Sequence, residues 1–179
     1  VLLAIKRHIK CREVYNKTTQ ANEVIAVEIE TQGFKSILIS SIYVPPTAKI
    51  NLSTFDDLYN INNNCIIGGD FNATSQEKGS RKTNSKGRQL QELFKEGLID
   101  CVDDDYTTFE RHDYEEKLDW ILASQPLLSF ITNVETHALI GTVTGHKPLT
   151  FDIPLRVEVK LPSPRISFSF NAAKWPLFR

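Results

Sequence analysis

Short apolar runs separated by polar breaks dominate the chain, and most have the length of a single strand. Residues 24–30 alternate apolar and polar side chains, whereas residues 36–44 are almost continuously apolar, and both patterns predict strands. Gly33 lies between them in a segment typical of a tight hairpin. Residues 65–67 predict a short buried strand that runs into two glycines and an aspartate. Further apolar runs predict strands at residues 1–5, 107–109, 118–123, 130–136 and 149–153.

Two segments have the period of a helix. Ser53, with Asp56 three residues later, predicts a capped helix that extends to about residue 60. Residues 85–96 carry apolar side chains at helical spacing, and Gly97 is a natural stop. Strands separated by isolated helices, with a hairpin among them, predict an α+β or layered α/β domain.

A change of pattern near residue 155 predicts the end of this domain. Prolines interrupt the chain at positions 154, 162 and 164, and the apolar pattern loosens there. We therefore expect a domain over residues 1–155 and a linker or tail over residues 156–179, in which Trp175 and Phe178 dock on another surface. Because the chain contains no methionine and starts within an apolar run, we also expect it to be part of a longer protein.

Composition limits the class of protein. With 179 residues, of which 41% are hydrophobic and 24% charged, the chain fits one globular domain with a sizeable core. Its apolar runs are far shorter than the roughly 20 residues that cross a bilayer, so no membrane partner is expected. Three widely spaced cysteines form neither a zinc pattern nor a disulfide framework, which favours a reducing intracellular compartment.

Charge is balanced overall but segregated locally. The net charge of −1 gives no general attraction to nucleic acid. Residues 78–88, however, carry only basic charges, and residues 100–105 are rich in aspartate. Such segregation suits one-sided contact with phosphates, and a solvated loop is the alternative. The candidate DNA contacts in the basic segment are Arg81, Lys82, Lys86 and Arg88.

An acid and an amide follow the strand predicted at residues 65–67. In an extended chain, Asp70 and Asn72 point to one side while Phe71 points to the core. A carboxylate and an amide held together at a strand end can orient a water molecule and hydrogen-bond a phosphate oxygen. The alternative is a turn rich in Asp and Asn, which is common after strands.

Three further side chains are candidates for the same chemistry. Asp119 lies inside an apolar run, where a carboxylate is costly to bury unless a partner such as a histidine is present. His146 lies on a turn between Gly145 and Pro148, just before a predicted strand. Tyr43 ends its strand beside two prolines. Each of these residues, taken alone, is also compatible with a purely structural role.

The order of these pieces resembles the endonuclease/exonuclease/phosphatase superfamily, which includes deoxyribonuclease-I-like and apurinic endonucleases. The similar motifs are Y-x-P at residues 43–45, GDFN at residues 69–72, LDWIL at residues 118–122 and TGHKP at residues 144–148. Residues 79–88 (GSRKTNSKGR) are similar to a segment of the endonucleases that non-LTR retrotransposons carry in front of their reverse transcriptase.

The resemblance implies a fold and a reaction. The fold would be a four-layered α/β/β/α sandwich of two packed mixed sheets flanked by helices, without its first strands. The domain would nick double-stranded DNA in the nucleus with Mg²⁺ or Mn²⁺. The 3′-hydroxyl left by the nick would prime a covalently linked reverse transcriptase.

The same resemblance implies a role for each site residue. Asp70 would position or deprotonate the attacking water, and Asn72 would assist it. His146 would contact the scissile phosphate, held by Asp119, and Tyr43 would touch the same phosphate.

Two departures from the family pattern predict impaired activity. Gly145 stands where the family has an aspartate, and it offers no side-chain ligand. The family's metal-binding glutamate and an active-site asparagine lie upstream of residue 1. We therefore assign no metal ligand from the sequence, and we expect the metal to be weakly held or lost. The alternatives are a catalytically inactive remnant that only binds DNA or a partner, and another phosphodiesterase or phosphatase of the same fold.

Overall fold

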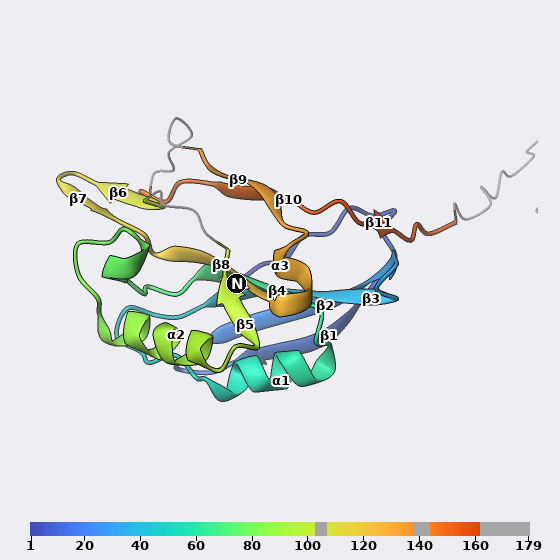
Figure 1. The fold of residues 1–179 in the computed structure, drawn as a ribbon, viewed down its shortest axis with the longest axis horizontal. Coiled ribbons are helices and arrows are strands. Elements are labelled where there is room, and N and C mark those ends of the chain that lie inside the picture. Colours follow the sequence, from blue (N-terminus) through green and yellow to red (C-terminus); the bar gives the residue numbers. More distant parts are fainter. Residues whose placement is uncertain (103–106, 138–143, 162–179) are drawn as a thin grey trace, which may run out of the picture.

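A mixed seven-stranded sheet forms the centre of the fold (Figure 1). The computed structural model describes residues 1–102, 107–137 and 144–161. Six strands pair in the order β1-β2-β3-β4-β8-β5, and β11 pairs with β2. These strands are β1 (Cys11–Thr18), β2 (Glu23–Gln32), β3 (Ser36–Tyr43), β4 (Cys65–Asp70), β5 (Ile99–Cys101), β8 (Asp119–Ser124) and β11 (Arg156–Val157).

The expected strands at residues 24–30, 36–44 and 65–67 are confirmed as β2, β3 and β4. The β2–β3 pair is the predicted hairpin, with Gly33 at a positive φ of 107° in the turn. Strands β3 and β4 are parallel, so the chain between them must cross over, and helix α1 (Ser53–Ile61) makes that crossover. The other pairs of the large sheet are antiparallel.

Helices α1 and α2 (Ser85–Lys95) cover one face of the large sheet (Figure 1). Their apolar sides pack against β3, β4 and β8 in a core that includes Phe55, Leu90 and Trp120, all of which are buried. Both helices were predicted at these positions. The predicted cap of α1 is not formed, because Ser53 is already helical and its hydroxyl bonds the side chain of Asn51.

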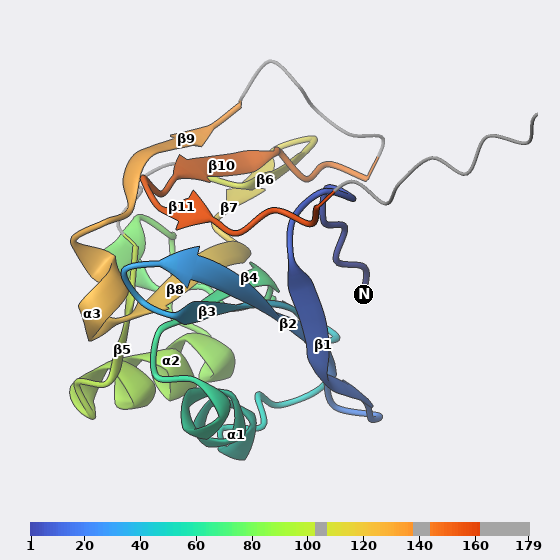
Figure 2. The same cartoon turned by 90° about the vertical axis from the view of Figure 1, so that its right-hand side faces the viewer.

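A smaller layer covers the opposite face of the sheet (Figure 2). It contains the two-stranded sheet of β9 (Thr132–Thr136) and β10 (Leu149–Asp152), the short helix α3 (Gln125–Leu128), and residues near the N-terminus. A hairpin of β6 (Phe109–Arg111) and β7 (Tyr114–Glu116) projects from one end. The remaining element is a short 3-10 helix, η1 (Gln76–Lys78).

The α+β class is confirmed, and the layering is simpler than the expected four-layered sandwich. Among the residues that the structure describes, the layers are helices, the large sheet and the β9–β10 pair, and no further helical layer lies outside that pair. Within the same residues, no helix is long and apolar enough to cross a membrane.

The start of the domain differs from the expectation, and strand pairing extends slightly past residue 155. Residues 1–5 form no strand, and the exposed fractions of Val1 and Leu2 are 49% and 84%. The first strand is instead β1, whose mostly polar sequence is held by its backbone pairing with β2. At the other end, β11 pairs with β2 and Lys160 donates its backbone N–H to His8, so ordered pairing continues past residue 155. Trp175 and Phe178 lie outside the described residues.

Candidate active site

Three of the expected site residues lie side by side on neighbouring strands. The parallel register places Asp70 beside Tyr43 on β3, and the antiparallel register places Asp70 opposite Asp119 on β8. Close approach of β3 and β4 depends on Gly69, where an added Cβ would lie 1.9 Å from the carbonyl oxygen of Ile42. Strand pairing therefore brings a phenol and two carboxylates to one end of the sheet.

Asp70 and Asn72 interact directly, although the chain between them is not extended. Asn72 has a positive φ of 48°. Its backbone N–H donates to Oδ1 of Asp70 at 2.9 Å, and its Nδ2 donates to Oδ2 at 3.1 Å and to the carbonyl of Val44 at 3.1 Å. Phe71 is fully buried, as predicted. The turn rich in Asp and Asn, which the sequence offered as the alternative to a site, is therefore part of the proposed site.

His146 lies between the two aspartates. Its Nδ1 is 2.8 Å from Oδ2 of Asp119, so an Nδ1–H donates to that carboxylate, as the sequence predicted. Its Nε2 lies 3.8 Å from Oδ2 of Asp70. That second separation exceeds a hydrogen bond and leaves the Nε2 directed toward the same space as the Asp70 carboxylate.

The β6–β7 hairpin holds the turn that carries His146. His146 forms an isolated bridge with Phe109, and their rings meet edge to face at 5.0 Å. The next residue, Lys147, donates its backbone N–H to Thr108 and forms ion pairs with Glu110 at 2.8 Å and Glu115 at 3.3 Å. The position of the imidazole therefore depends on a segment about 35 residues earlier in the chain.

Burial raises the pKa of both site aspartates above the ordinary value for aspartate. For Asp70, the charge of Asp119 acts in the same direction, whereas the N–H of Asn72, the imidazole of His146 and the ammonium group of Lys86 act against the rise in pKa. For Asp119, the hydrogen bond from His146 opposes the effect of burial. A carboxylate with a raised pKa is a stronger base than an ordinary one, which suits proton transfer near neutral pH.

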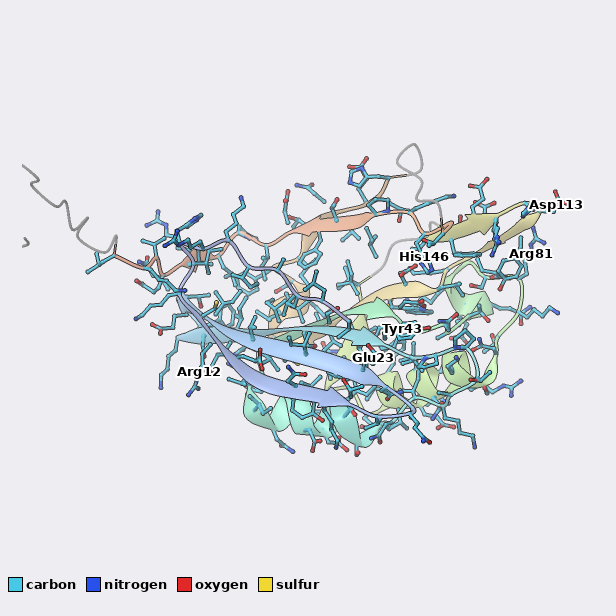
Figure 3. The ribbon with its side chains drawn as sticks, turned by 180° about the vertical axis from the view of Figure 1, so that it is seen from behind. Arg12, Glu23, Tyr43, Arg81, Asp113 and His146 are labelled. Carbon is cyan, nitrogen blue, oxygen red and sulfur yellow. The ribbon has the colours of Figure 1, made fainter. Side chains whose placement is uncertain are left out.

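The site opens into a pocket of about 710 Å³. Its walls include Tyr43, Asp70, Asn72 and His146, and Asp119 lies behind the imidazole. Further lining residues come from the basic segment and the hairpin, namely Lys82, Thr83, Asn84, Phe109, Tyr114 and Glu116. Figure 3 shows His146 and the hairpin residue Asp113 at one end of the molecule, far from Arg12. A larger hollow beside Arg12 contains none of the expected site residues.

Asn84 and Thr108 support the site without having been predicted to do so. Asn84 caps α2 by accepting the N–H of Gly87, and its Nδ2 donates to the carbonyl of Asn72 at 2.9 Å. The hydroxyl of Thr108 accepts the backbone N–H of Asp119 at 2.9 Å. An Asn just before a helix is a recognisable cap in sequence. Nothing in the sequence indicates the contact of Thr108, because its partner is ten or more residues away.

The four candidate DNA contacts fall into two groups. Arg81, Lys82 and Arg88 are exposed, and Arg81 reaches the carbonyl of Asp113 on the hairpin at 3.5 Å (Figure 3). Lys86 is only 4% exposed, and its ammonium group donates to two backbone carbonyls of the protein. Lys86 therefore does not share the exposed surface of the other three. The aspartates at positions 103–105 lie outside the described residues.

Gly145 adopts a conformation that a side chain would disturb. Its φ is +96°, and an added Cβ would lie 2.6 Å from the carbonyl oxygen of Glu110 and 3.2 Å from the ring of Phe109. The N–H of Glu110 also donates to the carbonyl of Gly145 at 2.9 Å. The glycine is thus part of the packing of the hairpin against the His146 turn, and an aspartate would not fit here without movement of the backbone.

The two aspartates and the histidine also form a set of donors suited to a divalent cation. One ligand atom from each of Asp70, Asp119 and His146 lies within 4.8 Å of the others. Carboxylate oxygens suit Mg²⁺ and Mn²⁺, and an imidazole nitrogen is acceptable to Mn²⁺. Because burial raises the pKa of both carboxyl groups, a nearby cation would stabilise their charged forms. The residues present therefore fit such an ion.

Comparison with known protein families gave a match over more than half of the chain. The family model described as endonuclease-reverse transcriptase matches residues 37–142, which contain Tyr43, Asp70, Asn72 and Asp119. Comparison with curated protein sequences gave no match.

Two solved structures share the fold. The endonuclease domain of TRAS1, a telomere-specific non-LTR retrotransposon, aligns with a TM-score of 0.68 and 22% identity over 82% of this chain and 69% of that domain. The catalytic domain of Xenopus laevis APE2 aligns with a TM-score of 0.52 and 14% identity over 78% of this chain and 57% of its own length. From the family match, the chain belongs to the endonuclease-reverse transcriptase family of the endonuclease/exonuclease/phosphatase superfamily.

Proposed function

We propose that this chain is a metal-dependent DNA endonuclease domain that nicks target DNA and leaves a 3′-hydroxyl primer for reverse transcription. The observation that carries the proposal is the convergence of Asp70, Asn72 and His146 on one pocket, with Asp119 bonded to the imidazole from behind. The family adds the expectation of a linked reverse transcriptase. Action in the nucleus stays an expectation from the sequence resemblance.

The geometry supports hydrolysis of a phosphodiester by water. Asp70 accepts a proton from the attacking water, and its raised pKa makes it a better base. The water oxygen forms a bond to phosphorus as the bond from phosphorus to the 3′ oxygen breaks, and the 3′ oxygen leaves as an alkoxide that takes a proton from solvent to become the 3′-hydroxyl. Asn72 holds the Asp70 carboxylate through two hydrogen bonds, so the base is fixed before the substrate arrives.

His146 stabilises the phosphate. Because Asp119 accepts the hydrogen bond from Nδ1, Nε2 faces the pocket, and in the protonated imidazole it donates its N–H to a non-bridging phosphate oxygen. The 3.8 Å between Nε2 and Asp70 leaves the base and the donor separate, so both can act on one phosphate. Tyr43, which borders the same pocket, would donate its hydroxyl to this phosphate. With both imidazole nitrogens engaged in this way, a divalent ion at this cluster would be held by the carboxylates of Asp70 and Asp119 and would neutralise charge on the phosphate.

The exposed basic residues would hold the DNA backbone. Lys82 borders the pocket, and Arg81 lies against the hairpin that closes one side of it. Each phosphate contact contributes about 0.9 to the slope of log affinity against log salt concentration. Replacing Arg81 and Lys82 with alanine should therefore lower that slope by about 2. An unchanged slope would show that Arg81 and Lys82 are solvated and do not contact the DNA phosphates.

A second candidate function is DNA binding without cleavage, and Gly145 is the observation that favours it. The family aspartate is absent there, and the local backbone does not accommodate one. We infer that the chain cleaves more slowly than a family member with the aspartate.

A comparison of substrates tests the proposal. With Mg²⁺ or Mn²⁺, we expect nicking of duplex DNA and no phosphate release from inositol phosphates. The reverse preference would assign the chain to the phosphatases of this fold, and DNA binding with no cleavage of either substrate would support the second candidate. The control variant is Asp113→Asn, which alters an exposed side chain at the tip of the β6–β7 hairpin.

A further inference from the structure

We propose that Lys86 is a positioning residue of this active site, which fixes the strand end bearing Tyr43 through the carbonyls of Pro45 and Pro46. The inference rests on the proposed nuclease function. It also separates Lys86 from the exposed basic residues, among which its sequence position would place it.

The contacts of Lys86 are internal. Its Nζ donates to the carbonyl of Pro45 at 2.8 Å and to the carbonyl of Pro46 at 2.9 Å. The two consecutive prolines follow the end of β3 and have no backbone N–H to pair with a neighbouring strand. The carbonyl of Pro45 also accepts the backbone N–H of Ala48 at 3.0 Å, so Lys86 adds a second donor there. An ammonium group offers three donors, and here two of them are directed at adjacent carbonyls. Lys86 thereby adds two hydrogen bonds to a segment that lacks a backbone N–H at two adjacent positions.

That segment is one wall of the pocket. Val44, between Tyr43 and the prolines, donates its N–H to the carbonyl of Asp70 at 2.9 Å and accepts Nδ2 of Asn72 at 3.1 Å. Pro46 itself borders the pocket. A shift of the two proline carbonyls would therefore move Tyr43 and one of the groups that orient Asn72.

The first turn of α2 holds the opposite wall in the same way. Asn84 donates to the carbonyl of Asn72 and accepts the N–H of Thr74. Gly87 packs so closely that an added Cβ would lie 1.9 Å from the carbonyl oxygen of Thr74. Lys86 lies between these two residues, so one helical turn contacts both segments that carry the catalytic groups.

The location of Lys86 is unfavourable for a lysine on other grounds. A cation in the first turn of a helix opposes the helix dipole. Burial also lowers the pKa of Lys86, with the nearby Asp70 acting in the opposite direction. Neither helix stability nor solubility accounts for a charged group here. A contact with DNA would need an accessible ammonium group, and Lys86 is 4% exposed.

The test compares Lys86→Met with Lys95→Met, which removes an exposed charge from the last turn of the same helix. Nicking kinetics are measured well below the melting temperature of each variant, so that a loss of stability alone does not lower the rate. For Lys86→Met we expect kcat to fall by about 10- to 100-fold, because small displacements of catalytic groups have effects of this size. KM and the salt dependence of DNA affinity should stay within twofold of the wild type.

Amide hydrogen exchange gives a second readout that does not depend on cleavage. In Lys86→Met, the amides of Val44 and Asn72 should exchange at least tenfold faster, whereas the amide of Val27 in β2 should not change. A lower salt slope with unchanged kcat would overturn the inference in favour of a phosphate contact. Unchanged exchange at Val44 and Asn72 would overturn it as well.

The two readouts separate this inference from the proposed function. If the wild type does not cleave DNA, the proposed function fails, and hydrogen exchange still decides whether Lys86 holds the pocket wall. If Lys86→Met does not fold, Lys86→Gln takes its place in both measurements, because its shorter side chain keeps an amide NH₂ group. Unchanged kcat with a lower salt slope, or unchanged exchange at Val44 and Asn72, would again overturn the inference.

Discussion

Trp120 donates its indole N–H to the carbonyl of Ala73 at 2.9 Å, and both residues are buried. Trp120 follows Asp119 on β8, whereas Ala73 follows Asn72 in the loop after β4. This bond therefore links the strand that orients His146 to the loop that directly follows the proposed base, Asp70. The same buried side chain, Trp120, thus packs in the core and connects two parts of the proposed active site.

Trp120→Phe should weaken both stability and cleavage. The change keeps an aromatic ring but leaves the carbonyl of Ala73 without its donor, which costs about 1–3 kcal/mol of unfolding free energy. Urea denaturation measures that loss, and plasmid nicking should show a lower kcat. Phe94→Leu, which alters a ring 6.4 Å from that of Trp120, is the control. It should lower stability without a matching loss of kcat. Equal kcat for Trp120→Phe and the wild type would contradict this link.

The two consecutive glycines of β4 should tolerate substitution very differently. At Gly69, an added Cβ meets the backbone of Ile42 at 1.9 Å and the φ of +154° is unusual for other residues. At Gly68, the nearest atom to an added Cβ is the carbonyl oxygen of Trp120 at 3.9 Å. We expect Gly69→Ala to separate β3 from β4 and lower the melting temperature by at least 10 °C, and Gly68→Ala to lower it by only a few degrees. Similar melting temperatures for the two variants would show that β3 and β4 are not this close.

Gly145→Asp, which introduces the family's residue, should not restore activity. The side chain would collide with the backbone of Glu110, and the positive φ disfavours a non-glycine residue. We expect a lower melting temperature and slower nicking, because the turn that holds His146 must move. Faster nicking by Gly145→Asp would show that the missing carboxylate, rather than the packing of the hairpin, limits the rate.

The raised pKa of Asp119 predicts a pH-dependent effect of its removal. Because the folded state binds the proton more tightly than the unfolded state, stability falls as pH rises from the ordinary pKa of aspartate through the raised one. Asp119→Asn removes this penalty. Without divalent ions, its melting temperature relative to the wild type should therefore increase from pH 3 to pH 7. A constant difference would contradict a raised pKa.

Addition of Mg²⁺ or Mn²⁺ at pH 7 gives the complementary measurement. A bound cation stabilises the folded state, so the melting temperature of the wild type should rise with ion concentration. The rise should be smaller in Asp119→Asn, which lacks one of the two carboxylates proposed to hold the ion. Equal shifts in the two proteins would place the ion elsewhere.

Much of the fold was predictable from local pattern. The alternation in β2 and the apolar run of β3 are typical of strands, and the helical period of α2 ends at Gly97, which has a positive φ of 74°. Strand β1 was not predictable, because its sequence is mostly polar. Its pairing with β2 holds it, and Val14 and Tyr15 pack on the core. The pattern at residues 1–5 was misleading, because Leu3 and Ile5 pack against the core without forming a strand.

A site residue was most predictable from the sequence where its burial is energetically costly unless it has a partner. Asp119 lies in an apolar run and needed a partner, and the structure provides His146 at 2.8 Å. The sequence predicted that Asn72 lies on the same side as Asp70, and the two side chains do meet. The predicted reason, an extended chain, is wrong, because the backbone turns at Asn72. Nothing in the sequence indicates that Lys86 is buried, because the carbonyls that accept its hydrogen bonds belong to two prolines, 41 and 40 residues earlier in the chain.

Cleavage of supercoiled plasmid by the wild type and by Asp70→Asn, in Mg²⁺ or Mn²⁺, tests the central claim most directly. We predict that the wild type converts supercoiled plasmid to open circles whose ends a DNA polymerase extends without further treatment. Asp70→Asn, which keeps the size of the side chain but cannot act as the base, should lose this conversion while it still binds DNA. Equal nicking by the two proteins, or none by the wild type at any ion concentration, would contradict the assignment of this pocket as a nuclease site.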